Sequence, residues 1–247
     1  MANTFSLDLE SGSSQYAAKT DTASLSITGD ISIECWVKLE SLPGNGAAYG
    51  LINKGDIGTP SQGYRYTIQN DAGTYNLYAA LNQTANDTTR DVFLYEIGDI
   101  TGTWTHIAVT ADLSEASATT FTFIINGSDE GNGSAVVAGN ISSINDNADE
   151  MIVGATESSS SKQQFLDGLI DEVRIWNDVR TPTEVTNNYQ KELTGGEAGL
   201  VAYYKLNNGY LDETSNSNDL TASGSPVFSS DVPFTGEAAS LSYAYFM

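Results

Sequence analysis

The chain has 247 residues, with 32 acidic side chains against 10 lysines and arginines, and its formal net charge is −22. Ten cations are too few for the large basic surface that phosphate binding needs, so we expect no nucleic-acid partner. A single cysteine, Cys35, and a single histidine, His106, exclude an internal disulfide framework, a cysteine-based zinc cluster and any multi-histidine metal site. The apolar fraction of 40% argues against a disordered acidic chain and fits one β-sandwich or barrel, or two smaller domains.

The two ends of the chain carry different signals. Residues 1–8 lack the basic and apolar regions of a secretory signal peptide, and the sequence has no stretch of about 18 apolar residues, so we expect no membrane insertion. Residues 235–247, which end in Tyr245-Phe246-Met247, are predicted to form a tail after a single domain at 1–234. This tail would either fray or add a strand to its own sheet or to that of a neighbouring subunit.

Alternation of apolar and polar side chains with a period of two runs through most of the chain and predicts β-strands. In residues 31–39, for example, every second side chain from Ile31 to Leu39 is apolar. Two hairpin turns are predicted by composition, at residues 70–73 and at Asn126-Gly127. The predicted strands are 31–39, 64–68, 74–81, 91–95, 104–110, 120–125, 151–154, 165–176 and 199–206.

One segment, residues 181–193, has the pattern of a helix. Thr181 is a candidate N-cap, Pro182 suits the first turn, and Gly195-Gly196 would end the helix. The side chains that share one face at helical spacing are Val185, Tyr189 and Leu193. About a dozen short strands with one short helix indicate an all-β fold, an antiparallel two-sheet sandwich.

Three parts of the sequence together resemble the laminin-G-like, concanavalin A-like lectin/glucanase jelly-roll family. They are residues 5–17 with 31–37, residues 103–110 with Ile125-Asn126-Gly127, and residues 165–177. The last of these contains Asp171-Glu172-Val173-Arg174-Ile175-Trp176 and is the most specific. The resemblance extends over residues 5–234 and implies a concanavalin A-like two-sheet jelly roll.

The resemblance also implies a structural calcium ion near the strand at Asp171 and the loop at 212–219. This loop offers carboxylate, amide and backbone oxygens, which are the ligands that Ca²⁺ prefers. Ser215 and Ser217 stand where the family usually has glycine. The alternative is a turn whose side chains bond its own backbone. The expected calcium ligands are Asp171, Asp212, Asn216 and Asp219.

The residues give little support to catalysis. A nucleophilic triad or dyad would have to use His106, which lies inside a predicted strand and is expected to bond a neighbour. Glycoside hydrolysis needs two carboxylates at a defined separation, and the sequence contains no E-x-D-x-x-E strand. Asp171 and Glu172 would point to opposite faces of a strand, so one would reach the ion while the other pairs with Arg174 or meets solvent. We expect no enzymatic activity.

Aromatic side chains could form a platform for a sugar, because their rings offer large flat apolar surfaces. The alternative is ordinary packing on a sheet, which we favour two to one on general grounds. The three tryptophans, at 36, 104 and 176, match core or near-core positions of the family. The candidates for the sugar platform are Tyr64, Tyr66, Tyr75 and Tyr78.

A single laminin-G-like module without a visible signal peptide resembles structural proteins of tailed-phage virions. We therefore predict a non-catalytic display and binding module on a virion surface, as a capsid decoration or a tail adhesion protein. Its partners would be other virion proteins or copies of itself, and a glycan on a cell surface. The alternative is a secreted or cell-surface carbohydrate-binding lectin module, which would be extracellular. Both interpretations rest on family analogy.

Overall fold

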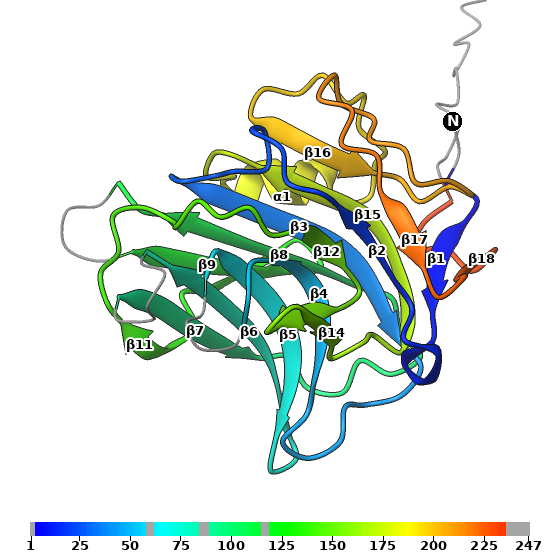
Figure 1. The fold of residues 1–247 in the computed structure, drawn as a ribbon, viewed down its shortest axis with the longest axis horizontal. Coiled ribbons are helices and arrows are strands. Elements are labelled where there is room, and N and C mark those ends of the chain that lie inside the picture. The colour runs from blue at the N-terminus through cyan, green and yellow to red at the C-terminus, as the bar shows by residue number, and fades with distance from the viewer. Residues whose placement is uncertain (1–2, 58–61, 84–88, 115–118, 236–247) are drawn as a thin grey trace, which may run out of the picture.

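Strands with alternating apolar side chains pair into two antiparallel sheets that pack face to face, with one short α-helix on the outside (Figure 1). The computed structural model describes residues 3–57, 62–83, 89–114 and 119–235. It confirms the predicted all-β two-sheet sandwich with one short helix. The predicted tail, from residue 236 onward, lies outside the described residues. In the described part of the chain, no helix is long and apolar enough to cross a membrane.

The first sheet, sheet I, has the order β10-β9-β8-β3-β15-β1-β18, and β16 pairs with the second half of β15. The long central strands β3 and β15 carry two of the segments on which the family resemblance rests. The strands of sheet I are β1 (Ser6–Leu9), β3 (Ile31–Leu39), β8 (Thr105–Asp112), β9 (Thr120–Ile125), β10 (Ser128–Gly131), β15 (Gly168–Trp176), β16 (Leu200–Tyr204) and β18 (Val227–Ser229).

The second sheet, sheet II, has the order β11-β7-β6-β5-β4-β12-β2-β17. Its strands are β2 (Tyr16–Lys19), β4 (Ala48–Lys54), β5 (Tyr64–Asp71), β6 (Thr74–Asn82), β7 (Arg90–Glu96), β11 (Ser134–Ala138), β12 (Met151–Val153) and β17 (Thr221–Ser223). A separate hairpin of β13 (Thr156–Ser158) and β14 (Ser161–Gln163) leads to a contact with β4, where Gly50 donates its N–H to the Gln164 carbonyl. A short 3₁₀ turn, η1 (Ser11–Ser13), follows β1.

The apolar core lies between the two sheets, because each strand directs alternate side chains inward. At one end, Phe121 and Phe123 of β9 stack on Phe93 and Tyr95 of β7, with ring centroids 4.6 and 5.7 Å apart. Burial of such rings, at about 25 cal/mol per Å² of apolar surface, is the main force that holds sheet I to sheet II.

The hairpin predicted at Asn126-Gly127 is confirmed. Both residues have positive φ, 50° and 77°, so they form the two-residue turn that joins β9 to β10. Glycine at position 127 also allows close approach of the helix, since a Cβ there would lie 2.8 Å from the Tyr189 ring. The Thr186 hydroxyl donates to the Gly127 carbonyl, which fixes the helix on the hairpin.

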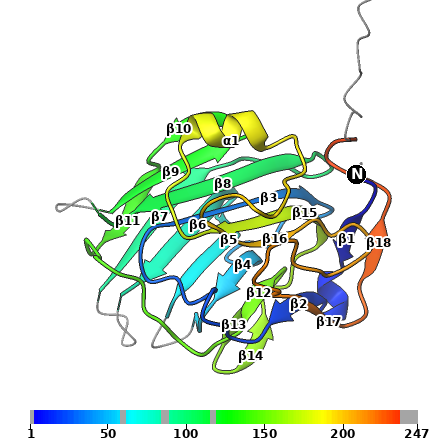
Figure 2. The ribbon, with the colours of Figure 1, turned by 90° about the horizontal axis from the view of Figure 1, so that it is seen from above.

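Helix α1 (Pro182–Asn188) begins with a capping box, in which the side chains and backbone N–H groups of Thr181 and Glu184 bond each other. The helix is shorter than the predicted span, which reached Leu193. Leu193 instead lies in the segment after the helix, where its N–H donates to the Tyr203 hydroxyl and its side chain packs beside Tyr203. Seen from above, α1 lies over β8, β9 and β10, outside sheet I (Figure 2).

The tryptophans lie on the outer side of sheet I rather than between the sheets. Trp36 is 5% exposed and stacks on Tyr189 at the end of α1, with centroids 5.8 Å apart. Trp176 is 3% exposed and belongs to the cluster of Leu193 and Tyr203. Trp104 is partly exposed and donates to Asp231. Together with α1, these contacts close the outer face of sheet I.

A network of buried charges lies beneath this cover. Arg174 of β15 lies 2.8 Å from Glu172 Oε2 and 3.5 Å from Glu34 Oε1, and it donates to two backbone carbonyls at and just after the end of α1. All three side chains are almost completely buried. Burial alone would raise the pKa of Glu34, but the charge of Arg174 and the hydrogen bonds to the carboxylate outweigh it and lower this pKa to about 2. Glu34 is therefore ionised at neutral pH.

We expect Arg174→Met to lower the free energy of unfolding by about 3–5 kcal/mol, because it leaves Glu34 buried and without its cation. Urea denaturation at neutral pH measures this change. Arg180→Met is the matched control, since Arg180 pairs with the more exposed Asp178 and Glu184, and its loss should cost less than about 1 kcal/mol. Equal costs for the two variants would contradict the role of the network.

Candidate functional site

The four candidate tyrosines divide between the two sides of sheet II. Tyr64 and Tyr66 of β5 point into the core and are 1% and 2% exposed, and burial raises the pKa of both phenols. The packing interpretation is therefore confirmed for these two. Tyr78 lies between two core residues of β6, so its partly exposed ring is on the outer face of the sheet. Tyr75, also partly exposed, lies at the hairpin end of the same strand.

Tyr78 forms a stacked pair with Arg65 on this outer face. The Cζ atom of Arg65 lies 4.4 Å from the centroid of the Tyr78 ring. Gln69 of β5 and Asn76 of β6 are directly opposed on the same face, and Leu94 of β7 is opposite Tyr78. All five side chains are partly exposed, and we call them the Arg65–Tyr78 face.

The Arg65–Tyr78 face combines the groups that bind a polyhydroxylated ligand. Tyr78 and Leu94 offer apolar surface, while the two amides can each donate and accept hydrogen bonds. The sequence analysis included Tyr78 but missed Arg65. The strict alternation in Tyr64-Arg65-Tyr66 was the available signal, because it places Arg65 opposite to two buried rings.

A polar pocket of about 470 Å³ is a second place where a small ligand would fit. It lies between residues 23–30 and a wall formed by Asn177, Val201 of β16 and Asn216. Its lining consists of hydroxyl, amide and carboxylate groups with a few aliphatic side chains, and it includes no aromatic ring. It therefore lacks the flat apolar surface of the Arg65–Tyr78 face.

The loop after β16 brings together three of the four predicted calcium ligands, Asp212, Asn216 and Asp219. Each carboxylate oxygen of Asp212 accepts two hydrogen bonds of 2.9–3.0 Å, from three backbone N–H groups and the Thr214 hydroxyl. Asp219 accepts from the Asp212 N–H, and Asn216 donates to a backbone carbonyl of β16. These are the bonds of a turn held by its own side chains, and a calcium ion would have to replace some of them. The calcium site stays a prediction.

The fourth predicted ligand, Asp171, lies on β15 and is fully buried. Its oxygens accept from Asn3 Nδ2 at 2.7 Å and from the Glu172 N–H at 2.9 Å. Burial, reinforced by the nearby Glu172 carboxylate, raises its pKa well above the ordinary value. Glu172 pairs with Arg174, which was one of its two predicted outcomes. A bulge between Asp171 and Arg174, with φ of 51° at Glu172, interrupts the simple alternation on which that prediction rested.

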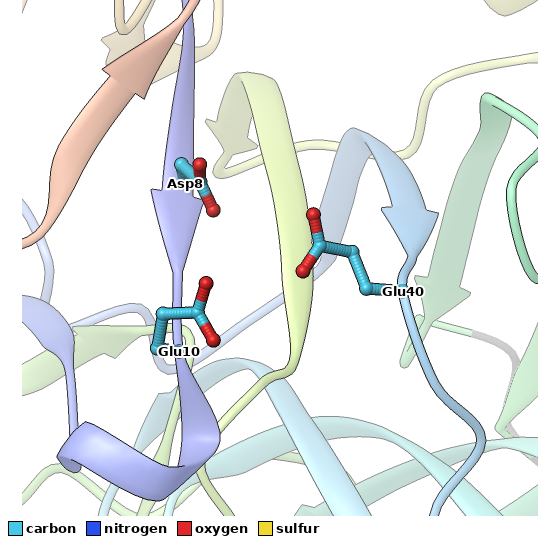
Figure 3. Close-up of side chains that lie close together, drawn as sticks. All are labelled: Asp8, Glu10 and Glu40. Atoms are coloured by element: carbon cyan, nitrogen blue, oxygen red, sulfur yellow. The ribbon is translucent and has the colours of Figure 1, made fainter.

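Within the described chain, one group of three acidic side chains has its carboxylate oxygens within 4.8 Å of one another: Asp8, Glu10 and Glu40. Figure 3 shows Asp8 of β1 and Glu10, which follows β1, facing Glu40, which follows β3, with β15 between the two segments. Burial and neighbouring carboxylates raise the pKa of Asp8 and Glu40. A divalent cation would relieve this repulsion, so the group could bind a metal. Sequence reasoning missed it because β1 and β3 meet only through long-range pairing with β15.

His106 lies on β8 and is 1% exposed, with its Nε2 atom 3.0 Å from Glu34 Oε2. Burial lowers its pKa, and the Glu34 carboxylate opposes this only in part. The rings of Trp36 and Tyr189 pack against it. A buried imidazole in this position matches the predicted strand residue bonded to a neighbour, and it has no access to a substrate.

Comparison with known proteins gives one family. The model of the concanavalin A-like lectin/glucanases superfamily, in its Laminin_G_3 form, matches residues 11–186. No curated protein matches the chain. Among solved structures, a candidate carbohydrate-binding protein from Bacteroides ovatus is 17% identical with a TM-score of 0.66, and the match covers 93% of this chain and 60% of that one.

Two further structures have the same fold. The CBM40 module of the Ruminococcus gnavus IT-sialidase, bound to α2,3 sialyllactose, is 14% identical with a TM-score of 0.54, over 76% of this chain and 98% of that one. A SAP-like pentraxin from Limulus polyphemus is 10% identical with a TM-score of 0.52, over 87% and 94%. At such identities the likeness shows the fold alone. The chain also spans only 60% of the length of the Bacteroides protein.

We expect chelation to lower the melting temperature by several degrees relative to calcium. With a Kd of about 0.1 mM and about 10 mM calcium, binding would stabilise the fold by about 2.7 kcal/mol. Differential scanning fluorimetry in calcium and in EDTA measures the difference. Asp212→Asn should abolish it, and Glu40→Gln should leave it unchanged. The opposite pattern would assign the ion to the group of Asp8, Glu10 and Glu40. An unmodified protein with the same melting temperature in calcium and in EDTA would contradict the predicted calcium site.

We expect Asp171→Asn to stabilise the protein at neutral pH when measured in EDTA. The folded state raises the pKa of this carboxyl, so it binds more protons than the unfolded state above about pH 4, and stability falls as the pH rises. Removing the charge should raise the free energy of unfolding at pH 8, and the gain should vanish toward pH 3. Urea denaturation from pH 3 to 8 measures both effects. A variant that is less stable at pH 8 would contradict this.

Proposed function

The chain belongs to the concanavalin A-like lectin/glucanase superfamily, and we propose that it is a carbohydrate-binding module without catalytic activity. The observation that carries this proposal is the Arg65–Tyr78 face on sheet II. There a partly exposed aromatic ring lies beside two side-chain amides and a guanidinium on adjacent strands. Sugars present apolar ring faces and many hydroxyls, and this face offers partners for both.

The structural neighbours support this proposal to a limited degree. The sialidase module was solved with a bound oligosaccharide, and the Bacteroides protein is described as a candidate carbohydrate binder. Both share the sandwich fold with this chain, and a fold alone does not fix a function. The proposed carbohydrate binding therefore rests on the chemistry of the Arg65–Tyr78 face.

The absence of catalysis is part of the proposal. The superfamily includes glucanases as well as lectins, so membership is compatible with either. The sequence lacks the E-x-D-x-x-E strand, and its single histidine is buried against Glu34. The three clustered acids at 8, 10 and 40 have no aromatic side chain among them to hold a sugar ring. Binding is thus the better-supported role.

The predicted placement on a phage virion stays a prediction, as do the single domain at 1–234, self-association through the tail, and the extracellular alternative. A lectin-like binding module fits the extracellular alternative more directly, because it needs no virion partner. A glycan on a cell surface is a suitable ligand under either placement.

We expect Tyr78→Ala to weaken binding to any glycan that the unmodified protein selects on a glycan array, by about tenfold or more, because it removes the exposed ring from the face. Tyr75→Ala is the matched control, since this tyrosine lies on the same strand but outside the face. Isothermal titration calorimetry with the selected glycan measures both variants. A protein that selects no glycan, or equal losses in the two variants, would overturn the proposal.

A further inference from the structure

Among the described residues, Arg65 has no acidic partner, although the chain has 32 acids for 10 bases. In the described part of the chain, most cations lie within 3.5 Å of a carboxylate: Lys38, Lys54, Lys162, Arg174, Arg180 and Lys205. The other cations include Arg65, Lys19 and Lys191, and none of these three forms an ion pair with a described residue. In such an acidic protein, an unpaired arginine on a sheet face calls for an explanation.

Arg65 differs from the two unpaired lysines because its position is fixed. Its guanidinium lies over the Tyr78 ring at 4.4 Å. Its Nε atom is buried and has no hydrogen-bond partner among the described residues. Arg65 is thus not held by a hydrogen bond at Nε, and the N–H groups of its two terminal nitrogens remain available to a ligand.

The residues directly beside Arg65 on the outer face are neutral, while Glu96 of β7 lies opposite Asn76 at the hairpin end of the face. Its cross-strand partners are Asn53 on β4 and Ala80 on β6. The next residue of β5 on this face is Thr67. None of the five residues of the Arg65–Tyr78 face is acidic. The end of the face around Arg65 is therefore locally positive on a molecule with a net charge of −22.

We infer that the Arg65–Tyr78 face recognises an acidic saccharide, with Arg65 binding its carboxylate group. This inference rests on the proposed carbohydrate-binding function. The planar guanidinium fork matches a planar carboxylate through two parallel hydrogen bonds. One fixed cation suits one carboxylate, and the overall negative charge repels densely sulfated chains. Tyr78 orients the fork, while Gln69 and Asn76 take the sugar hydroxyls.

Calorimetric titration with a matched pair of ligands tests this inference. The pair is an oligosaccharide of uronic acid and its carboxyl-reduced, neutral counterpart, and a sulfated form of the neutral one is the third ligand. The unmodified protein should bind the uronic acid form about tenfold or more tightly than the neutral form. Arg65→Gln should remove this preference by weakening the binding of the uronic acid form to about that of the neutral form.

Two further variants sharpen the test. Lys19→Gln removes an unpaired charge elsewhere and should keep the full preference. Arg65→Lys keeps a charge but loses the fork, so its preference should be intermediate. Melting temperatures of all variants establish that they are folded.

The inference is overturned if the unmodified protein binds the two forms equally, if the preference survives in Arg65→Gln, or if the sulfated form is preferred. It is also overturned if Arg65→Gln weakens both forms equally, since Arg65 would then only position Tyr78. In each of these cases the proposed function stands as long as Tyr78→Ala weakens glycan binding more than Tyr75→Ala does. A protein that binds no glycan at all overturns the proposed function, and the inference with it.

Discussion

The ion pairs of Arg174 with Glu34 and Glu172 allow helix α1 to cover the outer face of sheet I. Charged side chains on an outer face would normally be solvated, and covering them costs desolvation energy unless they are paired. Arg174 provides that pairing, and it also donates to backbone carbonyls at the end of α1. The helix can therefore lie on sheet I, and the tryptophans and His106 are buried with it. Among the described residues, no helix lies on the central strands of sheet II, and partly exposed side chains on its outer face are available to a ligand.

The distribution of charge follows the same division. Most cations of the described chain are used in ion pairs that fix loops and the helix, as with Lys54, which is buried against Asp21 and backbone carbonyls. A large negative charge keeps a protein soluble and repels anions. At physiological ionic strength, salt largely screens this repulsion at distances beyond about 8 Å. A single exposed guanidinium can therefore still attract an anionic group at contact distance. The acidity of the chain and a local preference for a carboxylate are compatible for this reason.

The features that could be predicted from the sequence are those set by neighbouring residues. The turn at Asn126-Gly127 and the capping box at Thr181 depend on residues two or three apart, and both occur where expected. Alternation located the strands but not the side that faces the core. The sequence alone could not distinguish Tyr66, which is buried, from Tyr78, which is exposed, because that depends on which face of sheet II meets sheet I.

Contacts between distant segments were beyond the reach of the sequence. Asp8 and Glu40 approach each other only because β1 and β3 pair with opposite edges of β15. The loop at Asp212 shows the opposite case. Its residues are close in sequence and do come together, but carboxylate and amide groups serve equally well as calcium ligands and as acceptors for backbone N–H groups. Composition indicates that side chains order the loop. It does not indicate whether they do so by binding calcium or by accepting hydrogen bonds from the loop's own backbone.

The bulge in β15 is the point where a local irregularity has consequences for the whole face of sheet I. A strict strand would send Asp171 and Glu172 to opposite sides. The bulge, with Glu172 in the left-handed region, instead keeps both on the outer side of sheet I. There Glu172 pairs with Arg174, and its carboxylate adds to the burial that raises the pKa of Asp171. A non-glycine residue in this conformation stores strain, which the ion pair beneath α1 offsets. The strained Glu172, the buried ion pairs of Arg174 and the raised pKa of Asp171 thus lie together on sheet I. The Arg65–Tyr78 face lies on sheet II, where β5, β6 and β7 pair in continuous register, so its side chains can change without disturbing the interactions that hold the fold.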